Sequence, residues 1–487
     1  MDKIKVTFLK DRRCVIDIDS PYFMTLRNHF SYDNPAARFT KYSRLPKRLY
    51  SITMKGYCDI GLLWNVMKFI RSEGWDANLD ITDRVRSILS KQIECELVEV
   101  PNKKYKLRDY QLDSVKNALD NGSGLCLVGT GGGKSLIIAT LLETLYKNDG
   151  ESFKAMLVVP NLSLIEQMTD DFTTYQCSFS CSKWSGKNEL NESTNVVIVN
   201  TGFLQSSKER SSEYDHFFKT VDYIFYDEVH LFGNEPEPKA TVLIKSYKYK
   251  AVFGFTGSLP DNTYESDKVY GFFGKPFYEK TSKSLRDENY LTKVQIKMVY
   301  FNHNTPFEEI YDKDAEDVEN YNNEVDFITT CDFRNQKLKN IVSKIDGNVL
   351  VLVDRIEQGE ILENLFNDIV DKKVYFIRGS MPVEERSKII LEMESANNII
   401  CIAMSKIFST GISINNLPYA VFYLIGKAWN KTIQSIGRGL RLHENKEVFN
   451  LFDLCDNLVF SKKQSEVRKK IYDNQKIEYK EFNVYEK

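Results

Sequence analysis

Long apolar runs are missing from this 487-residue chain, and no stretch approaches the roughly 18 apolar residues of a membrane span. The first residues also lack the continuous apolar core of a signal peptide. Cysteine is scattered: of the nine, only Cys177 and Cys181 lie close together, without a second pair at zinc-ligand spacing. These absences argue against a membrane protein and a zinc finger, and they predict a cytoplasmic protein with reduced thiols.

An excess of charge of either sign is missing as well. The formal net charge is −2, and the 42% of hydrophobic and 28% of charged residues are ordinary for a globular protein. Any nucleic-acid surface must therefore be a local patch. The length predicts about three domains, because one hydrophobic core does not serve so long a chain. No nuclease constellation is recognisable.

The most informative stretch runs from Leu125 to Ile138. A short apolar run ends at a glycine-dense turn, and helical periodicity begins at Lys134, which predicts strand, loop and helix. Such a loop turns backbone N–H groups toward phosphate oxygens, and the helix adds the positive end of its dipole. Lys134 supplies a charge for the β- and γ-phosphates, and Ser135 a hydroxyl ligand for Mg²⁺. The predicted nucleotide contacts here are Thr130, Gly131, Gly132, Gly133, Lys134 and Ser135.

Two observations weaken that prediction when it is taken alone. A glycine-rich turn is often only a tight connection between two elements. Val128 also stands where the strict phosphate-loop pattern has its first glycine, although the glycine and lysine core is intact.

A pair of acidic residues closes a later apolar run. Residues 221–226 predict a strand, which delivers Asp227 and Glu228 about ninety residues after the phosphate loop. Removal of a γ-phosphate needs one carboxylate for Mg²⁺ and a second to orient or deprotonate the attacking water. This placement favours a catalytic pair over a solvated surface loop.

The alternation of apolar strands and helical stretches begins again after about Leu291. Apolar strands are predicted at 349–353, 374–377, 399–403 and 420–424, separated by helical stretches, which indicates a second parallel α/β domain. This second domain contains the segment GRGLR, with Arg438 and Arg441, and Gln434 shortly before it. Arginines three apart on a helix share a face, and their charge suits a phosphate oxyanion across a domain cleft. The same spacing also fits a structural salt-bridge pair.

Residues 1–100 predict a small α+β unit. Between Ala36 and Cys58 it carries cations interleaved with aromatic residues and no acidic residue, which suits a phosphate track with base stacking. A solvated strand face over a local core explains the pattern equally well. The candidate DNA contacts are Arg38, Lys41, Arg44, Lys47 and Arg48.

The order of the motifs is more specific than any one of them. In sequence, spacing and strand-end context they resemble the superfamily 2 DExH helicases, and the resemblance covers about residues 105–460. Within that superfamily the chain looks most similar to the UvsW-type recombination helicases of bacteriophages, through FSTGISINNL, QSIGRGLR and the basic N-terminal domain. A phage-encoded chain would act in the host cytoplasm. The motifs are LVGTGGGKS, VVPNLSLIEQM, VNTGFL, DEVH, TGS, FSTGIS and QSIGRGLR.

The resemblance implies specific catalytic roles. It implies that Asp227 holds the metal and that Glu228 activates the attacking water. It also implies that Arg438 and Arg441 are arginine fingers, with Gln434 beside them.

The resemblance further implies binding roles. Arg108 and Gln111, about one turn apart, match the adenine-reading Q motif. Ser413 stands where many relatives have aspartate after Gly411, which puts a ribose contact at this position in doubt. The residues implied to contact the nucleic-acid backbone are Pro160, Asn161, Thr201, Arg355, Ser409 and Thr410.

The sequence thus predicts a small α+β DNA-binding domain (residues 1–100) followed by two RecA-like parallel-sheet motor domains. The first, residues 101–300, binds ATP; the second, residues 301–487, ends in a helical tail. The expected activity is ATP hydrolysis coupled to DNA translocation, with ATP and Mg²⁺ as cofactors. It would remodel branched DNA by branch migration, fork regression or unwinding in recombination, repair or replication.

Two alternative functions stay open. One is a nucleic-acid clamp that ATP switches with little translocation, and the other is an RNA helicase, because motor motifs grip backbone without distinguishing sugars. The expected partners are branched, duplex and single-stranded DNA, with recombination or single-strand-binding proteins and no membrane. The chain is expected to be a monomer.

Overall fold

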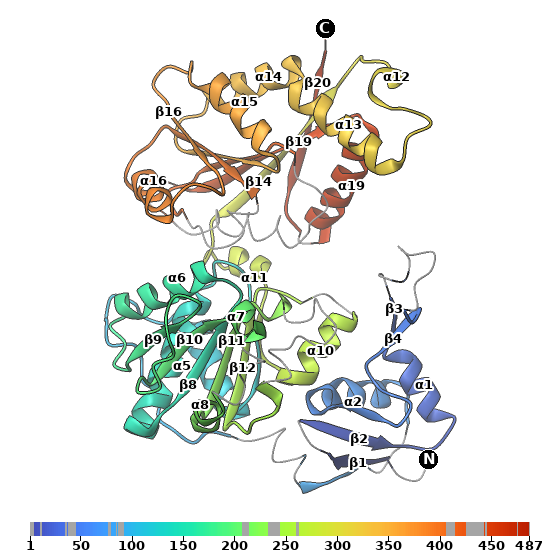
Figure 1. Cartoon of the computed structure of the whole chain (residues 1–487), viewed down its shortest axis with the longest axis vertical. Helices are drawn as coiled ribbons and strands as arrows, with labels where there is room; N and C mark the ends of the chain where they lie inside the picture. Colours follow the sequence, from blue (N-terminus) through green and yellow to red (C-terminus); the bar gives the residue numbers. More distant parts are fainter. Residues whose placement is uncertain are drawn as a thin grey trace. The chain divides into compact units, whose positions relative to one another are not determined.

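A computed structural model describes most of the chain (Figure 1). The described residues are 4–9, 12–34, 37, 45–75, 79–83, 85, 92–206, 214–231, 244–259, 263–405, 414–424, 443, 446–474 and 476–486. The chain divides into two compact units, residues 1–129 with 133–281 and residues 130–132 with 282–487. None of the described helices is long and apolar enough to cross a bilayer.

The N-terminal region is a small α+β layer, as predicted. Its mixed sheet has the order β5-β2-β1-β6, and a two-stranded sheet joins β3 and β4. Residues of β1 alternate between buried and exposed, so one face covers a local core. The elements are β1 (Ile4–Phe8), β2 (Arg13–Asp17), α1 (Tyr22–His29), β3 (Ser31–Asp33), β4 (Arg48–Tyr50), β5 (Tyr57–Asp59), η2 (Ile60–Leu62), α2 (Leu63–Ser72) and β6 (Leu79–Ile81).

The rest of the first unit is built on a seven-stranded parallel sheet of order β13-β7-β12-β11-β8-β10-β9. Every residue of β7, β8, β11 and β12 is buried, so these strands are covered on both faces. The strands are β7 (Gly124–Val128), β8 (Ala155–Val159), β9 (Cys181–Trp184), β10 (Val196–Asn200), β11 (Tyr223–Asp227), β12 (Ala251–Thr256) and β13 (Pro276–Lys280). The helices are α4 (Asp109–Asn121), α5 (Lys134–Asp149), η3 (Gly150–Ser152), α6 (Leu162–Thr174), α7 (Thr201–Ser206), α8 (Asp215–Thr220), η5 (Val229–Leu231) and α10 (Tyr264–Phe273).

The N-terminal region packs closely on this motor domain through η2 and α10. A Cβ on Gly61 would lie 2.1 Å from the Tyr270 carbonyl oxygen, so only glycine allows this approach. Tyr32 and Ser51 both donate hydrogen bonds to Oδ2 of Asp267, at 2.9 and 2.7 Å. These contacts join the basic N-terminal sheet to the first motor domain.

The second unit is a seven-stranded parallel sheet of order β16-β17-β15-β18-β19-β14-β20. The four predicted strands are present, and three further strands complete the sheet. The strands are β14 (Lys293–Asn302), β15 (Val349–Val353), β16 (Lys373–Ile377), β17 (Ile399–Met404), β18 (Tyr419–Phe422), β19 (Val448–Asp456) and β20 (Tyr479–Tyr485). The helices are α11 (Ser282–Asp287), α12 (Phe307–Ile310), α13 (Asp317–Thr330), α14 (Asp332–Ser343), α15 (Ile356–Phe366), α16 (Val383–Ser395) and α19 (Val459–Asn474).

Candidate nucleotide site and comparison with known proteins

The phosphate loop joins β7 to α5, as the sequence predicts. Gly131 (φ +83°) and Gly133 (φ +74°) adopt left-handed conformations that residues with a Cβ rarely adopt. The Lys134 ammonium group lies 3.5 Å from the Val128 carbonyl oxygen, to which it donates, and 3.9 Å from Oε1 of Glu228. The lysine charge is therefore held between the loop and the end of β11.

Gln111 connects the start of α4 to the phosphate loop. Its Oε1 accepts a hydrogen bond from the Arg108 backbone N–H at 2.9 Å, and its Nε2 lies 3.5 Å from the Gly133 carbonyl oxygen. A Cβ on Gly133 would lie 2.4 Å from that Nε2. The structure thus brings Gln111 next to the phosphate loop, with Arg108 bonded to it through its backbone at the start of α4.

The acid pair stands at the carboxyl end of β11. The Glu228 N–H donates to Oδ1 of Asp227 at 2.9 Å, and Glu228 has φ +53°, a conformation that costs a non-glycine residue energy. Burial and the neighbouring Glu228 raise the pKa of Asp227 to about 7, although the Lys134 charge opposes this rise. Two carboxylates are thus held together in a largely buried place.

Three hydrogen-bond partners of this site were not predicted: His230, Thr256 and Tyr175. Nδ1 of His230 lies 3.2 Å from Oε2 of Glu228 and 2.9 Å from Oγ1 of Thr256, so it links the ends of β11 and β12. Both residues belong to motifs already noted, DEVH and TGS. The hydroxyls of Ser135 and Tyr175 lie 3.1 Å apart, and no local pattern in the sequence signals this pairing.

The residues present fit a nucleoside triphosphate with a divalent cation. Gly131 and Gly133 have no side chains of their own to cover the loop backbone, and Lys134 supplies a cation beside it. Burial and the adjacent Glu228 raise the pKa of Asp227, and a divalent cation would offset the repulsion between these two carboxylates. Carboxylate and hydroxyl oxygens are the ligands that Mg²⁺ prefers. Among the described residues, no cluster of three or more His, Cys, Asp or Glu offers an additional metal site.

The structure brings two of the predicted backbone-contacting residues together at neighbouring strand ends. The Thr201 hydroxyl donates to the Pro160 carbonyl oxygen at 3.3 Å, after β10 and β8 respectively. Asn161 caps helix α6, because its Oδ1 accepts from the Leu164 N–H at 3.0 Å. In the second unit, Arg355 donates to Asp326 at 2.5 Å and Asn322 at 2.7 Å, so its guanidinium group is already engaged.

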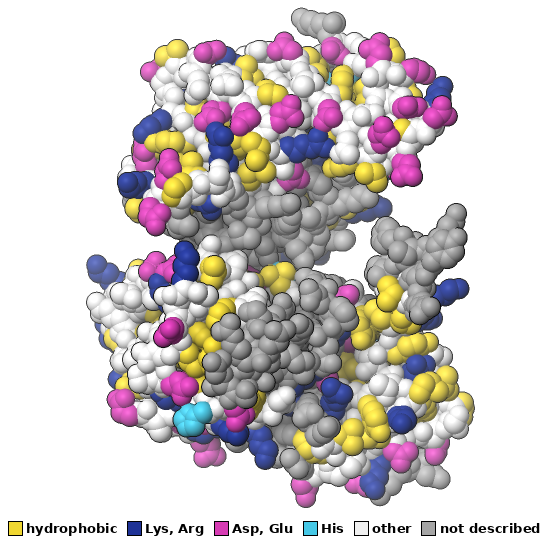
Figure 2. Space-filling view, viewed as in Figure 1, with side chains coloured by type: hydrophobic (Ala, Val, Ile, Leu, Met, Phe, Trp, Pro, Cys, Tyr) yellow, Lys and Arg dark blue, Asp and Glu magenta, His cyan; other side chains and the backbone are white. Residues whose placement is uncertain are grey.

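Of the N-terminal candidates, the structure describes two. Lys47 is exposed, and exposed Arg48 donates to the Ser31 carbonyl oxygen at 3.1 Å. On the face drawn in Figure 2, Lys and Arg side chains lie among Asp and Glu side chains rather than in one large field. The predicted residues outside the described part of the chain are Arg38, Lys41, Arg44, Ser409, Thr410, Gln434, Arg438 and Arg441.

Two protein families match the chain. Residues 104–261 match "Type III restriction enzyme, res subunit", and residues 334–443 match "Helicase conserved C-terminal domain". The "ATP-dependent DNA helicase uvsW" of Enterobacteria phage T4 is 27% identical over 481 residues, which cover 96% of this chain and 93% of that protein. The chain belongs to the superfamily 2 helicases.

Solved structures show the same fold for this helicase. S. cerevisiae Dbp5 bound to RNA and ADP BeF3 matches with a TM-score of 0.54 and 14% identity, over 79% of this chain and 91% of that chain. The ATP-dependent Type ISP restriction-modification enzyme LlaBIII bound to DNA matches with a TM-score of 0.58 and 15% identity, over 86% of this chain and 34% of that chain. The protein is an ATP-driven helicase, so it uses ATP and acts on nucleic acid.

Proposed function

We propose that this helicase is a DNA translocase that remodels branched DNA by branch migration, fork regression or unwinding, in recombination, repair or replication. The similarity to a phage DNA helicase across 96% of the chain carries this proposal. It extends over the N-terminal region, which both family matches leave out. A motor that only follows one strand does not need such a region, whereas a junction enzyme must also hold a duplex arm.

The nucleotide site supports a division of labour among its residues. Lys134 contacts the β- and γ-phosphates in both ground and transition states, and Arg108 and Gln111 contact the adenine. Ser135 and Asp227 hold Mg²⁺, which neutralises phosphate charge when it is bound. Glu228 orients the attacking water and takes its proton. The loop residues that cradle the phosphates are Thr130, Gly131, Gly132 and Gly133.

The second motor domain contributes charge to the transition state. Arg438 and Arg441 neutralise the developing negative charge of the γ-phosphate when the motor domains close, with Gln434 beside them. Closure and release then move two grips alternately along one strand. These grips use the backbone-contacting residues Pro160, Asn161, Thr201, Arg355, Ser409 and Thr410.

The second contact with DNA lies in residues 1–100, which form a DNA-binding domain in front of motor domains at 101–300 and 301–487. Its cationic stretch holds a neighbouring duplex arm through Arg38, Lys41, Arg44, Lys47 and Arg48. The tight packing of η2 on α10 makes the arm move with the first motor domain. The protein works as a monomer, alongside recombination or single-strand-binding proteins.

ATPase activity with single-stranded, duplex, forked and four-way DNA tests the proposal. We expect the highest turnover per DNA end with forked and four-way substrates, and ATP consumption that rises with the length of the track. Turnover that is independent of track length would instead indicate a nucleic-acid clamp. Stronger stimulation by matched RNA would indicate an RNA helicase.

A further inference from the structure

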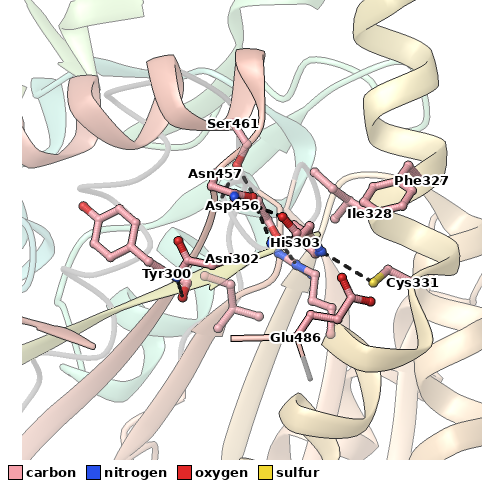
Figure 3. A network of polar contacts seen from close by, with 12 residues as sticks. Tyr300, Asn302, His303, Phe327, Ile328, Cys331, Asp456, Asn457, Ser461 and Glu486 are labelled. Atoms are coloured by element: carbon pink, nitrogen blue, oxygen red, sulfur yellow. Dashed lines mark hydrogen bonds and ion pairs between the residues drawn. The ribbon is translucent and has the colours of Figure 1, made fainter. Parts of the chain in front are cut away.

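A cysteine, a histidine and an aspartate form a hydrogen-bonded row in the second unit (Figure 3). His303 follows β14, Asp456 ends β19, and Cys331 joins α13 to α14. Nε2 of His303 lies 2.8 Å from Oδ1 of Asp456, and Nδ1 lies 3.8 Å from Sγ of Cys331. The histidine and aspartate side chains are 1% and 0% exposed, whereas Cys331 is partly accessible to solvent.

The histidine ring is held in place from several sides. Its backbone N–H donates to Oδ1 of Asn457 at 3.0 Å, and the Asn457 amide donates back to its carbonyl oxygen at 3.3 Å. The Phe327 ring packs edge-on against it, with centroids 5.2 Å apart. The orientation of Nδ1 toward the thiol is therefore built into the surrounding core.

A buried arginine adds a second cationic group to this row. Nε of fully buried Arg334 donates to the same Oδ1 of Asp456 at 2.9 Å, so two cationic groups share one carboxylate. Nη1 of Arg334 is buried without a hydrogen-bond partner among the described residues, and the charge of this arginine also interacts with Cys331. The other buried carboxylate nearby, Glu324, is used by the Tyr311 hydroxyl and the N-terminus of α19.

The histidine carries a proton on each ring nitrogen at neutral pH. Burial alone would lower the pKa of His303, but its hydrogen bonds to Asp456 and Cys331 raise it to about 9. With Nε2–H donating to Asp456, Nδ1–H is left to donate to the cysteine sulfur. A cationic donor beside a sulfur atom favours the nucleophilic thiolate.

We propose that Cys331 is a nucleophilic thiol and the site at which this helicase reacts with small disulfides such as glutathione disulfide. The Cys331 sulfur attacks one sulfur of the disulfide, the old S–S bond breaks, and a mixed disulfide forms. The released thiolate takes up the proton that the Cys331 thiol has lost. His303 keeps both of its protons and serves as a positioning residue.

The chain contains its own comparison set for this proposal. Cys95, Cys177 and Cys181 are partly exposed like Cys331, and no histidine acts on the pKa of any of these three thiols among the described residues. Burial raises the pKa of Cys95, and it raises the pKa of Cys177 and of Cys181 to about 12. The remaining cysteines are buried: Cys14, Cys58, Cys126, Cys401 and Cys455.

Site-resolved mass spectrometry of the full-length reduced protein, treated with glutathione disulfide at neutral pH, tests the proposal. We expect Cys331 to form its mixed disulfide roughly tenfold faster than the three comparison cysteines, because only its sulfur lies beside the His303 imidazole among the described residues. His303→Gln should slow Cys331 toward their rate and leave theirs unchanged. Cys331→Ser should abolish the fast phase.

The proposal would be overturned if, in the unaltered protein, Cys331 formed its mixed disulfide no faster than the three comparison cysteines, whatever the variants do. An unchanged Cys331 rate in folded His303→Gln would also overturn it, because the charged imidazole would then play no part.

Discussion

At the scale of single residues, the nucleotide site depends on charges placed against one another. Lys134 lies near Glu228, and Asp227 is buried beside both. The roles that we propose for these residues differ, so their substitutions should have different kinetic signatures. A group that contacts the phosphates throughout the reaction affects binding, whereas a group that acts on water affects only turnover.

We predict that Lys134→Ala weakens ATP binding and turnover together, whereas Glu228→Gln binds ATP and stalls. The loss of turnover in Glu228→Gln should be on the order of 10²- to 10⁴-fold, the range of general acid–base catalysis. Nucleotide affinity and DNA-stimulated ATPase rates measure both. Lys147→Ala, on the exposed side of the same helix, should match the parent. Parental hydrolysis by Glu228→Gln would show that the role of this strand end is misassigned.

Gly133 should be irreplaceable for a conformational reason. Its φ of +74° costs a residue with a Cβ about 1–2 kcal/mol, and the added carbon would meet Gln111 at 2.4 Å. We expect Gly133→Ala to raise the dissociation constant for ATP by about tenfold, since 1.4 kcal/mol corresponds to that factor. Fluorescent-nucleotide titration measures it. Gly186→Ala, with open space around it, is the control, and equal affinities of the two variants would contradict the prediction.

At the scale of elements, α10 fastens the N-terminal region to the first motor domain. Its Asp267 is almost completely buried and accepts hydrogen bonds from Tyr32 and Ser51. Burial raises the pKa of Asp267 to about 6, although the two hydrogen bonds oppose this rise. The folded protein therefore binds this proton more tightly than the unfolded chain, in which aspartate titrates near pH 3.9.

The sign of the resulting pH dependence follows from linkage. Between about pH 4 and 6 the folded state holds more protons at this position, so its contribution to stability falls as pH rises. We expect the free energy of unfolding of Asp267→Asn to rise, relative to that of the parent, by on the order of 2 kcal/mol as the pH increases across this window. Urea unfolding at a series of pH values measures the difference.

Exposed Glu384 provides the control for this experiment, because Glu384→Gln changes a carboxylate that α16 presents to solvent. If the free energies of unfolding of Asp267→Asn and the parent changed with pH in parallel, Asp267 would ionise equally easily in the folded and unfolded states. That result would contradict the prediction.

At the scale of the whole molecule, the choice of substrate rests on the N-terminal region. Charge reversal at Arg44, Lys47 and Arg48 should weaken binding to four-way DNA and leave single-strand-stimulated ATPase largely intact. Each lost phosphate contact lowers the salt slope by about 0.9 on B-form DNA, so anisotropy titrations over a range of salt reveal how many contacts disappear. Reversal at exposed Lys462 and Lys463 on α19 is the matched control. An unchanged slope in the triple variant would leave this patch as a solvated face.

The sequence predicted the parts of the fold that local pattern specifies. Strands buried on both faces form continuous apolar runs, so β7, β11 and β15 were predicted. The apolar runs of β16, β17 and β18 were predicted as strands too. It missed β14 and β19, whose residues alternate in burial, and β20, which is mostly exposed at the sheet edge. The stretch from Glu308 to Asp326 is rich in acidic residues and has no clear period in the sequence, yet most of it belongs to α12 and α13.

By itself, the sequence determined the phosphate loop, the acid pair and the superfamily, because each depends on neighbouring residues at strand ends. Tertiary structure alone decided which distant side chains complete these sites. The pairing of Ser135 with Tyr175, the two hydrogen bonds to Asp267 and the row from Cys331 to Asp456 join residues far apart in the chain. Such contacts leave no local period, because side-chain periodicity records only the face that an element buries and not the partner it meets.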